Sequence, residues 1–146
     1  MIGEDMSSRA PVIRTEFFIE GDELDPDEFT RLLEIRPYRT GKKGELSSHP
    51  AAARQGVKNS STFWFIEVEQ NSYDMDEGVQ TLLAQVWPHR DKIKEYLKTR
   101  PTVTVGMNTT IHIDKDRPVY EISLDSIKKL AELECRFMLN DIYPLD

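Results

Sequence analysis

Residues 17–30 have the sequence FFIEGDELDPDEFT, which joins an apolar strand to a sharply marked helix start. Asp25 occupies the N-cap position, where a carboxylate accepts a hydrogen bond from the backbone N–H two or three residues further on. Pro26 falls at the first helical position, where its missing N–H costs nothing. Glu28 matches the last position of a capping box. The stretch therefore predicts a strand, a turn and a helix that begins at Pro26 and runs to about Ile35.

The rest of the chain alternates segments with strand and helix patterns. Apolar and polar residues alternate as in strands over residues 12–20, 63–69 and 102–114, and shorter strands are expected at 39–46, 118–123 and 136–143. After an expected cap at Asp76, helical spacing continues across Pro88, which should kink that helix or start a second one. Ser123 or Asp125 is expected to cap the last helix. Residues 49–61 lack periodicity and are expected to form a surface loop.

The order of these elements predicts an α+β fold. A mostly antiparallel sheet should carry the helices on one face. The first six elements match a ferredoxin-like βαββαβ core, and the last three form a C-terminal β-α-β extension. We expect residues 1–11 to be a flexible N-terminal tail and residues 12–146 to form a single domain.

Composition narrows the class of protein. No apolar run approaches the roughly 20 residues that a membrane helix needs, and the N-terminal residues lack the apolar core of a signal peptide. Cys135 is the one cysteine, which fits a reducing compartment. These features predict a cytoplasmic protein with no membrane contact. The net charge of −7 argues against a nucleic-acid-binding protein, because phosphate contacts need Lys and Arg.

The segment 17–37, with its F-x-I-x-G-D-x-L-D-P pattern and the following Ile35-Arg36-Pro37, resembles the start of a bacterial domain-of-unknown-function family, number 4279. The family continues with a basic, glycine-containing segment and a strand that bears tryptophan, matched here by 39–44 and Trp64. A capped helix and a final strand that ends near an aromatic residue match 120–143. The resemblance implies a compact α+β domain, and since the family has no established activity it implies no catalytic or binding residue.

No pattern for catalysis or for a cofactor stands out. His112 and Asp114 lie on one strand face, but a metal site usually needs three or four protein ligands, so we expect a solvated strand end. His89 and His49 need no special role. Cys135 is expected to be a buried thiol. We therefore predict no cofactor, no metal and no catalytic residues, and favour a non-enzymatic role.

Charge patterning suggests two functions. Between Arg36 and Lys58 six basic residues accompany one acidic residue, Glu45, so this segment carries +5 and the remainder −12. The first hypothesis is a binding domain of immunity or inhibitor type, whose acidic surface, with Asp22 and Glu23, contacts a basic protein partner. The alternative is a small-ligand or enzyme domain that binds a phosphate-containing compound through the basic segment 36–58. Its anion-binding candidates are Arg36, Arg39, Lys42, Lys43 and Arg54.

Overall fold

A single five-stranded sheet organises the computed structural model, which describes residues 9–145. Its strands lie in the order β2-β3-β1-β4-β5, with bounds β1 (Val12–Glu20), β2 (Arg39–Gly41), β3 (Phe63–Asn71), β4 (Thr104–Ile113) and β5 (Cys135–Pro144). Neighbouring strands are antiparallel apart from β4 and β5, which are parallel. A parallel pair needs a crossover connection, and the helix α5 (Leu124–Glu132) supplies it.

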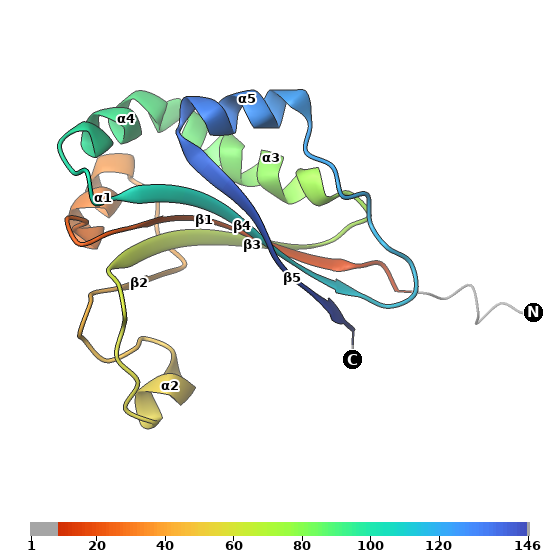
Figure 1. Ribbon diagram of the computed structural model, residues 1–146, viewed down its shortest axis with the longest axis horizontal. Helices are drawn as coiled ribbons and strands as arrows, with labels where there is room; N and C mark the ends of the chain where they lie inside the picture. Colours follow the sequence, from red (N-terminus) through yellow and green to blue (C-terminus); the bar gives the residue numbers. More distant parts are fainter. Residues whose placement is uncertain (1–8, 146) are drawn as a thin grey trace, which may run out of the picture.

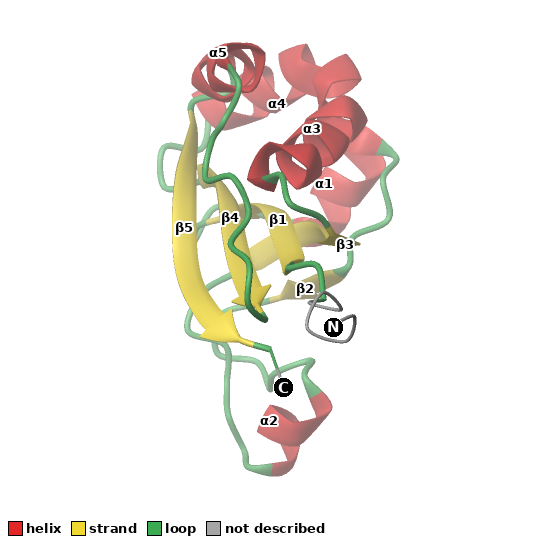
Figure 2. Cartoon of the chain, turned by 90° about the vertical axis from the view of Figure 1, so that its right-hand side faces the viewer, coloured by secondary structure: helices red, strands yellow, loops and turns green. Residues whose placement is uncertain are grey.

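The helices cover one face of this sheet (Figure 1). They are α1 (Pro26–Leu33), α3 (Met75–Val86), the 3₁₀ helix η2 (Trp87–His89), α4 (Arg90–Lys98) and α5. The short helix α2 (Pro50–Arg54) lies on the other side of the sheet (Figure 2). The predicted α+β class with a mostly antiparallel sheet is confirmed, while the ferredoxin-like description stays a prediction. Residues 1–8 of the expected tail lie outside the described residues.

Alternation along β1 decides which side chains enter the core. Its odd-numbered residues from Ile13 to Ile19 are buried, while the even-numbered ones are only partly buried. Ile13 packs with Met75 and Ile111. Phe17 and Ile19 belong to the main core cluster, together with apolar residues of the helices and of the neighbouring strands that include Phe29, Leu33, Trp64, Val79, Leu82, Ile93 and Met107. Period-two burial of this kind is what a strand with one covered face requires.

The start of α1 confirms the predicted cap and corrects the predicted capping box. Asp25 accepts hydrogen bonds from the backbone N–H groups of Asp27 and Glu28. Glu28 does not return the bond, because the Asp25 N–H donates to the Tyr96 hydroxyl at 3.1 Å. The Glu28 carboxylate instead accepts from Arg100 at 2.9 Å. Tertiary partners, Tyr96 on α4 and Arg100 just after it, thus replace the local motif.

A buried polar contact fastens α1 to the sheet. The indole N–H of Trp64, a fully buried side chain on β3, donates to the Thr30 hydroxyl at 2.9 Å. That hydroxyl donates in turn to the Pro26 carbonyl. Phe29 packs edge-on against Trp64, with 4.9 Å between the ring centroids. Because a buried indole N–H is costly to leave unpaired, Thr30 fixes where α1 sits on β3.

Several predicted boundaries need correction. The helix α1 ends at Leu33, followed by Glu34 in a left-handed conformation, and Asp74 rather than Asp76 caps α3. Residues 118–123 do not form a strand; Val119 makes one isolated bridge, to Asp74. The C-terminal extension is therefore a helix and a strand, and the cap of its helix is Ser123. Pro88 interrupts the long helix as expected, within η2.

Residues 42–61, called the arm below, form an extension of the β2–β3 hairpin. Leu46 bridges Lys58 in antiparallel fashion, and Ser47 N–H donates to the Val57 carbonyl. The helix α2 lies within the arm, so the expected loop over 49–61 is partly helical and the expected strand over 39–46 shrinks to Arg39–Gly41. Figure 1 shows the arm projecting away from the helix layer.

We predict that Thr30→Val lowers the free energy of unfolding by about 1–3 kcal/mol, because it leaves the buried Trp64 indole N–H without an acceptor. Denaturant unfolding followed by tryptophan fluorescence measures the change. Thr110→Val, on the sheet face away from the helices, is the matched control and should stay within about 0.5 kcal/mol of the wild type. Equal effects of the two substitutions would contradict the role given to Thr30.

Candidate functional site

The sheet face opposite the helices α1, α3, α4 and α5, called the open face below, carries one continuous row of residues across all five strands. Cross-strand pairing aligns Arg39 with Phe65, Phe65 with Phe18, Phe18 with Gly106, and Gly106 with Arg136. We call this line of residues, from Arg39 to Arg136, the aromatic row. At about 4.8 Å between neighbouring strands, it spans about 19 Å. A row with two phenyl rings at its centre and a guanidinium at each end is an unusual composition for a solvated sheet face.

Two glycines let the rings of the open face lie across neighbouring strands. A Cβ at Gly106 would come within 2.3 Å of the Phe18 ring, and one at Gly41 within 2.5 Å of the Phe63 ring. Phe63 also stacks on Phe65, with 6.1 Å between the ring centroids. The absence of side chains at these two positions therefore leaves room for the Phe18 and Phe63 rings on the open face.

Arg39 forms the first end of the aromatic row. Its guanidinium carbon lies 5.8 Å from the centroid of the Tyr38 ring and 6.0 Å from that of Phe65. Tyr38 is 58% exposed and packs against Phe65. Among the residues with described side chains, no carboxylate lies within ion-pair distance of Arg39. Its charge is held against aromatic rings and is available to an anion.

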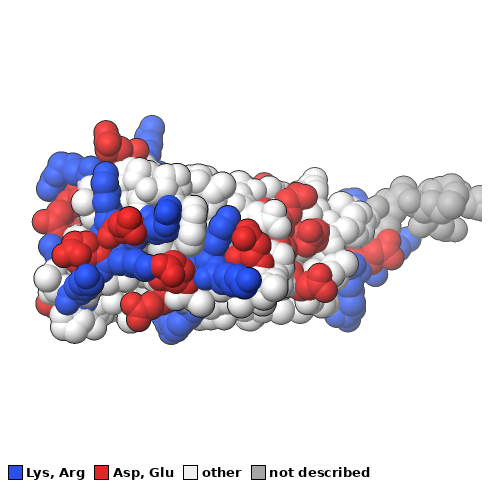
Figure 3. All heavy atoms as spheres, turned by 90° about the horizontal axis from the view of Figure 1, so that it is seen from above, with Lys and Arg blue, Asp and Glu red and all other residues white. Residues whose placement is uncertain are grey.

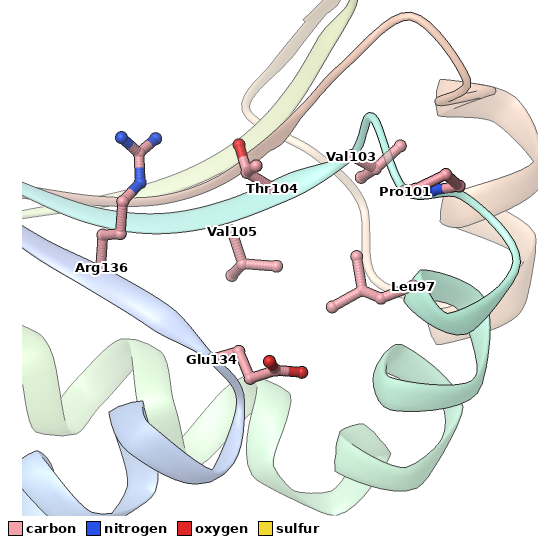
Figure 4. A pocket seen from close by; sticks show the side chains of 7 residues that line it. All are labelled: Leu97, Pro101, Val103, Thr104, Val105, Glu134 and Arg136. Atoms are coloured by element: carbon pink, nitrogen blue, oxygen red, sulfur yellow. The ribbon is translucent and has the colours of Figure 1, made fainter.

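Arg136 forms the opposite end of the row, beside a small cavity of about 300 Å³. Figure 4 shows Arg136 and Thr104 projecting to one side of the sheet, away from Leu97 and Val105 on the helix side. The Arg136 guanidinium is 4.0 Å from the Glu20 carboxylate, and its side chain remains 58% exposed. Because the two charged groups lie so far apart, most of the guanidinium surface remains accessible to solvent or to a ligand.

The next row along the strands, called the carboxyl row, places two acids directly opposite each other. Glu16 on β1 pairs in register with Glu67 on β3, and the Asn108 amide donates to Glu16 at 3.2 Å. Burial raises the pKa of Glu67, and Glu16 raises it further by charge repulsion and by a hydrogen bond between the two carboxyls, against the opposing effect of Arg14. Like charges opposite each other in a sheet are destabilising, so this pair marks the face as a candidate site.

The family model described as a domain of unknown function (DUF4279) matches residues 11–144. This chain belongs to the DUF4279 family. No curated protein and no solved structure matches it. In the part that the structure describes, no helix is long and apolar enough to cross a membrane.

The anion-binding residues predicted for this DUF4279 domain are spread over several elements. Arg39 alone lies in the aromatic row. Arg36 is exposed in the link between α1 and β2, and Lys42 and Lys43 are exposed at the base of the arm. Arg54 ends α2 within the arm. The structure therefore connects one of the five predicted residues to the aromatic surface.

The predicted partner-binding acids both have contacts within the chain. The Asp22 carboxylate is 3.6 Å from the Lys43 ammonium, and both side chains are more than 60% exposed. Glu23 accepts from the Thr102 backbone N–H at 2.9 Å, while its own N–H donates to the Thr102 hydroxyl. Glu23 thus holds the loop before α1 against the start of β4. On the helix side, acidic and basic side chains are interspersed (Figure 3).

His112 is half-buried rather than at a fully solvated strand end, while Cys135 is buried as expected. His112 stacks on Tyr143, and Asp114 accepts from Arg9, a contact that lowers the Asp114 pKa. Among the described residues, no group of three or more His, Cys, Asp or Glu is arranged to hold a metal. Cys135 is buried, and burial raises the pKa of its thiol to about 12. A thiol so rarely ionised is a poor nucleophile.

Sequence reasoning missed the aromatic row, although two signals pointed to it. Phe17 and Phe18 are adjacent in one strand, and Trp64 stands between Phe63 and Phe65 in another, so both faces of these strands carry large rings. A glycine inside a strand often marks a close approach by another group, as Gly106 does here.

We predict that Glu67→Gln raises the free energy of unfolding at pH 7 by about 0.5–1 kcal/mol, because it removes the like-charge pair. The raised pKa of Glu67 means that its contribution to stability is full below the ordinary value of 4.5 and is lost as the pH rises through the folded value. The gain should therefore shrink to near zero below about pH 4. Thermal and denaturant unfolding across pH measure it.

Glu69→Gln is the matched control, because Glu69 lies one row further along the same face of β3. It should change stability at pH 7 by less than about 0.5 kcal/mol. A loss of stability in Glu67→Gln at pH 7 would contradict the arrangement described for the carboxyl row.

Proposed function

We propose that this DUF4279 protein is a non-enzymatic binding domain that holds a planar, phosphate-bearing compound, such as a nucleotide, on its open face. The observation that carries the proposal is the aromatic row, in which Phe65 and Phe18 lie side by side between Arg39 and Arg136. The proposal keeps the phosphate-containing ligand expected from the basic segment and moves its centre from the arm to the sheet.

The rings supply a surface for stacking. Phe65 and Phe18 are direct cross-strand neighbours, and Phe63 extends the same surface. A base stacked on an aromatic side chain gains about 1–3 kcal/mol, whatever its identity. The Phe18 and Phe63 rings already lie close over Gly106 and Gly41, so we expect little conformational freedom to be lost when a ligand binds.

The two arginines supply the anion contact. A guanidinium matches the oxygen geometry of phosphate in a bidentate fashion and stays charged at any physiological pH. Arg39 is already oriented by Tyr38 and Phe65, which reduces the entropy lost per hydrogen bond formed. A net charge of −7 on the whole chain limits long-range attraction, so we expect affinity to come from stacking and short-range contacts.

The carboxyl row favours a second candidate, the immunity- or inhibitor-like protein with a basic partner. A partner's arginine can stack on Phe65 and pair with Glu67 or Glu16. Asp22 and Glu23 stay predicted contacts of such a partner. The substitution Glu67→Gln distinguishes the two candidates, because it removes one negative charge. It should lower the affinity for a basic partner, and it should leave the affinity for a phosphate ligand unchanged or raise it.

The test is a calorimetric titration of the full chain with nucleoside monophosphates, each compared with its nucleoside and with ribose 5-phosphate. Saturable binding should require both the ring and the phosphate. Phe65→Ala should weaken it about tenfold or more, as expected for the loss of one stacking contact. Arg39→Ala should weaken it as well and should reduce its dependence on salt.

Tyr73→Ala is the control, since Tyr73 is 47% exposed and precedes α3 on a different part of the surface. Unchanged affinity is expected there. Failure of every nucleotide to bind the folded wild type would contradict the proposal. Binding that is lost with Lys42→Ala and Lys43→Ala but kept with Phe65→Ala would place the ligand on the arm instead.

A further inference from the structure

A second surface, unrelated to the open face, carries exposed apolar side chains at the opposite edge of the sheet from β2. A depression of about 420 Å³ is lined by Ile122, Ile127, Leu130, Ala131, Cys135 and Phe137. Leu124 and Ile127 on α5 are 66% and 50% exposed, and Leu139 and Ile142 on β5 are 40% and 41% exposed. This surface, called the edge surface below, is larger than the scattered single apolar residues that are normal on a monomer.

The edge surface runs beside β5, which among the strands of the described residues 9–145 pairs on one side only. β5 is the last strand of the sheet and pairs with β4 alone. It is ten residues long, and its proline lies at its last position, Pro144. Natural edge strands are usually short or protected by lysines and prolines. β5 also carries one irregularity, the register shift opposite Thr109 and Thr110, and bulges of this kind protect edges as well. Its first five residues, 135–139, nevertheless form a regular edge flanked by apolar side chains, which is typical of a strand that pairs with another chain.

We propose that the edge surface binds a second copy of this chain, with the two β5 strands paired antiparallel about a two-fold axis. A strand paired antiparallel with its own copy satisfies two-fold symmetry by construction, so one surface serves both partners. The axis stands perpendicular to the sheet and leaves each helix layer on the same side. The two α5 helices then lie next to each other, and their exposed residues Leu124 and Ile127 face across the axis.

The dimensions of the edge surface fit a stable dimer. Ten residues of strand extend over about 34 Å, and a sheet with one helix layer is about 20 Å deep. This outline is close to the roughly 800 Å² per partner of a standard protein interface. The depression between α5 and the start of β5 is lined by apolar residues, as is the buried core of known interfaces.

The charges of α5 favour the same partner. The exposed helix carries two acids and two lysines, and Asp125 already pairs with Lys129 at 3.2 Å. Glu132 pairs with Lys94 of α4. A second copy of α5 therefore brings no excess of positive or negative charge. A strongly acidic or basic partner would gain no electrostatic attraction from this surface.

Pairing of this kind creates one continuous sheet from two copies. Because the two-fold axis is perpendicular to the sheet, both open faces lie on the side opposite the helices. The dimer then presents two aromatic rows on a single surface, and Arg136, which belongs to β5, lies near the junction. The dimer does not depend on the proposed ligand, since the edge surface and the open face share no apolar contact residue.

The test is the mass of the full chain in solution, measured by light scattering and by sedimentation over about a hundredfold range of concentration. The wild type should show twice the chain mass of 16.9 kDa. Ile127→Glu and Leu139→Glu should each halve the mass, because each buries a charge in the apolar interface. Far-ultraviolet circular dichroism checks that both variants remain folded.

Leu46→Glu is the matched control, because Leu46 is 55% exposed but lies in the arm. This variant should remain dimeric. A wild type that is monomeric at every concentration would overturn the proposal, as would a dimer that survives both Ile127→Glu and Leu139→Glu. A dimer disrupted by Leu46→Glu alone would assign the interface to the arm and would also overturn it.

Discussion

The fold depends on β1, which pairs along all nine of its residues with β3 on one side and with β4 on the other. A strand bonded on both sides cannot slip by one residue without reversing every side chain. Phe17 and Ile19 are thereby committed to the core, and Phe18 and Glu16 to the open face. The buried residues and the candidate site are two consequences of one register.

The position of α1 on the sheet determines where the aromatic row begins. Thr30 and Trp64 fix the helix on β3, and the helix ends at Leu33 with a left-handed Glu34. The short link that follows returns the chain to the sheet, where Tyr38 N–H donates to the Phe65 carbonyl at 2.8 Å. Tyr38 and Arg39 therefore reach the open face because of how α1 is held.

Local sequence patterns were sufficient to predict the features that depend on neighbouring residues in the chain. The Asp25 cap, the alternation in β1 and the break at Pro88 were all predicted and are confirmed. Tertiary partners decided the rest: Tyr96 and Arg100 replaced the capping box. The aromatic row joins residues from five strands, and only the pairing register brings Arg39 and Arg136 to the same line. The spacing of these residues along the chain therefore does not predict the row.

The central claim is that the open face, rather than the arm or the helix side, receives the ligand. Backbone amide chemical shifts of the labelled full chain, recorded while a nucleoside monophosphate is added, test it most directly. The account predicts that the largest shifts follow the aromatic row, at Arg39, Phe65, Phe18 and Gly106, with the alternating core residues of β1 less affected. Shifts confined to the arm, residues 42–61, or to the helices would contradict it.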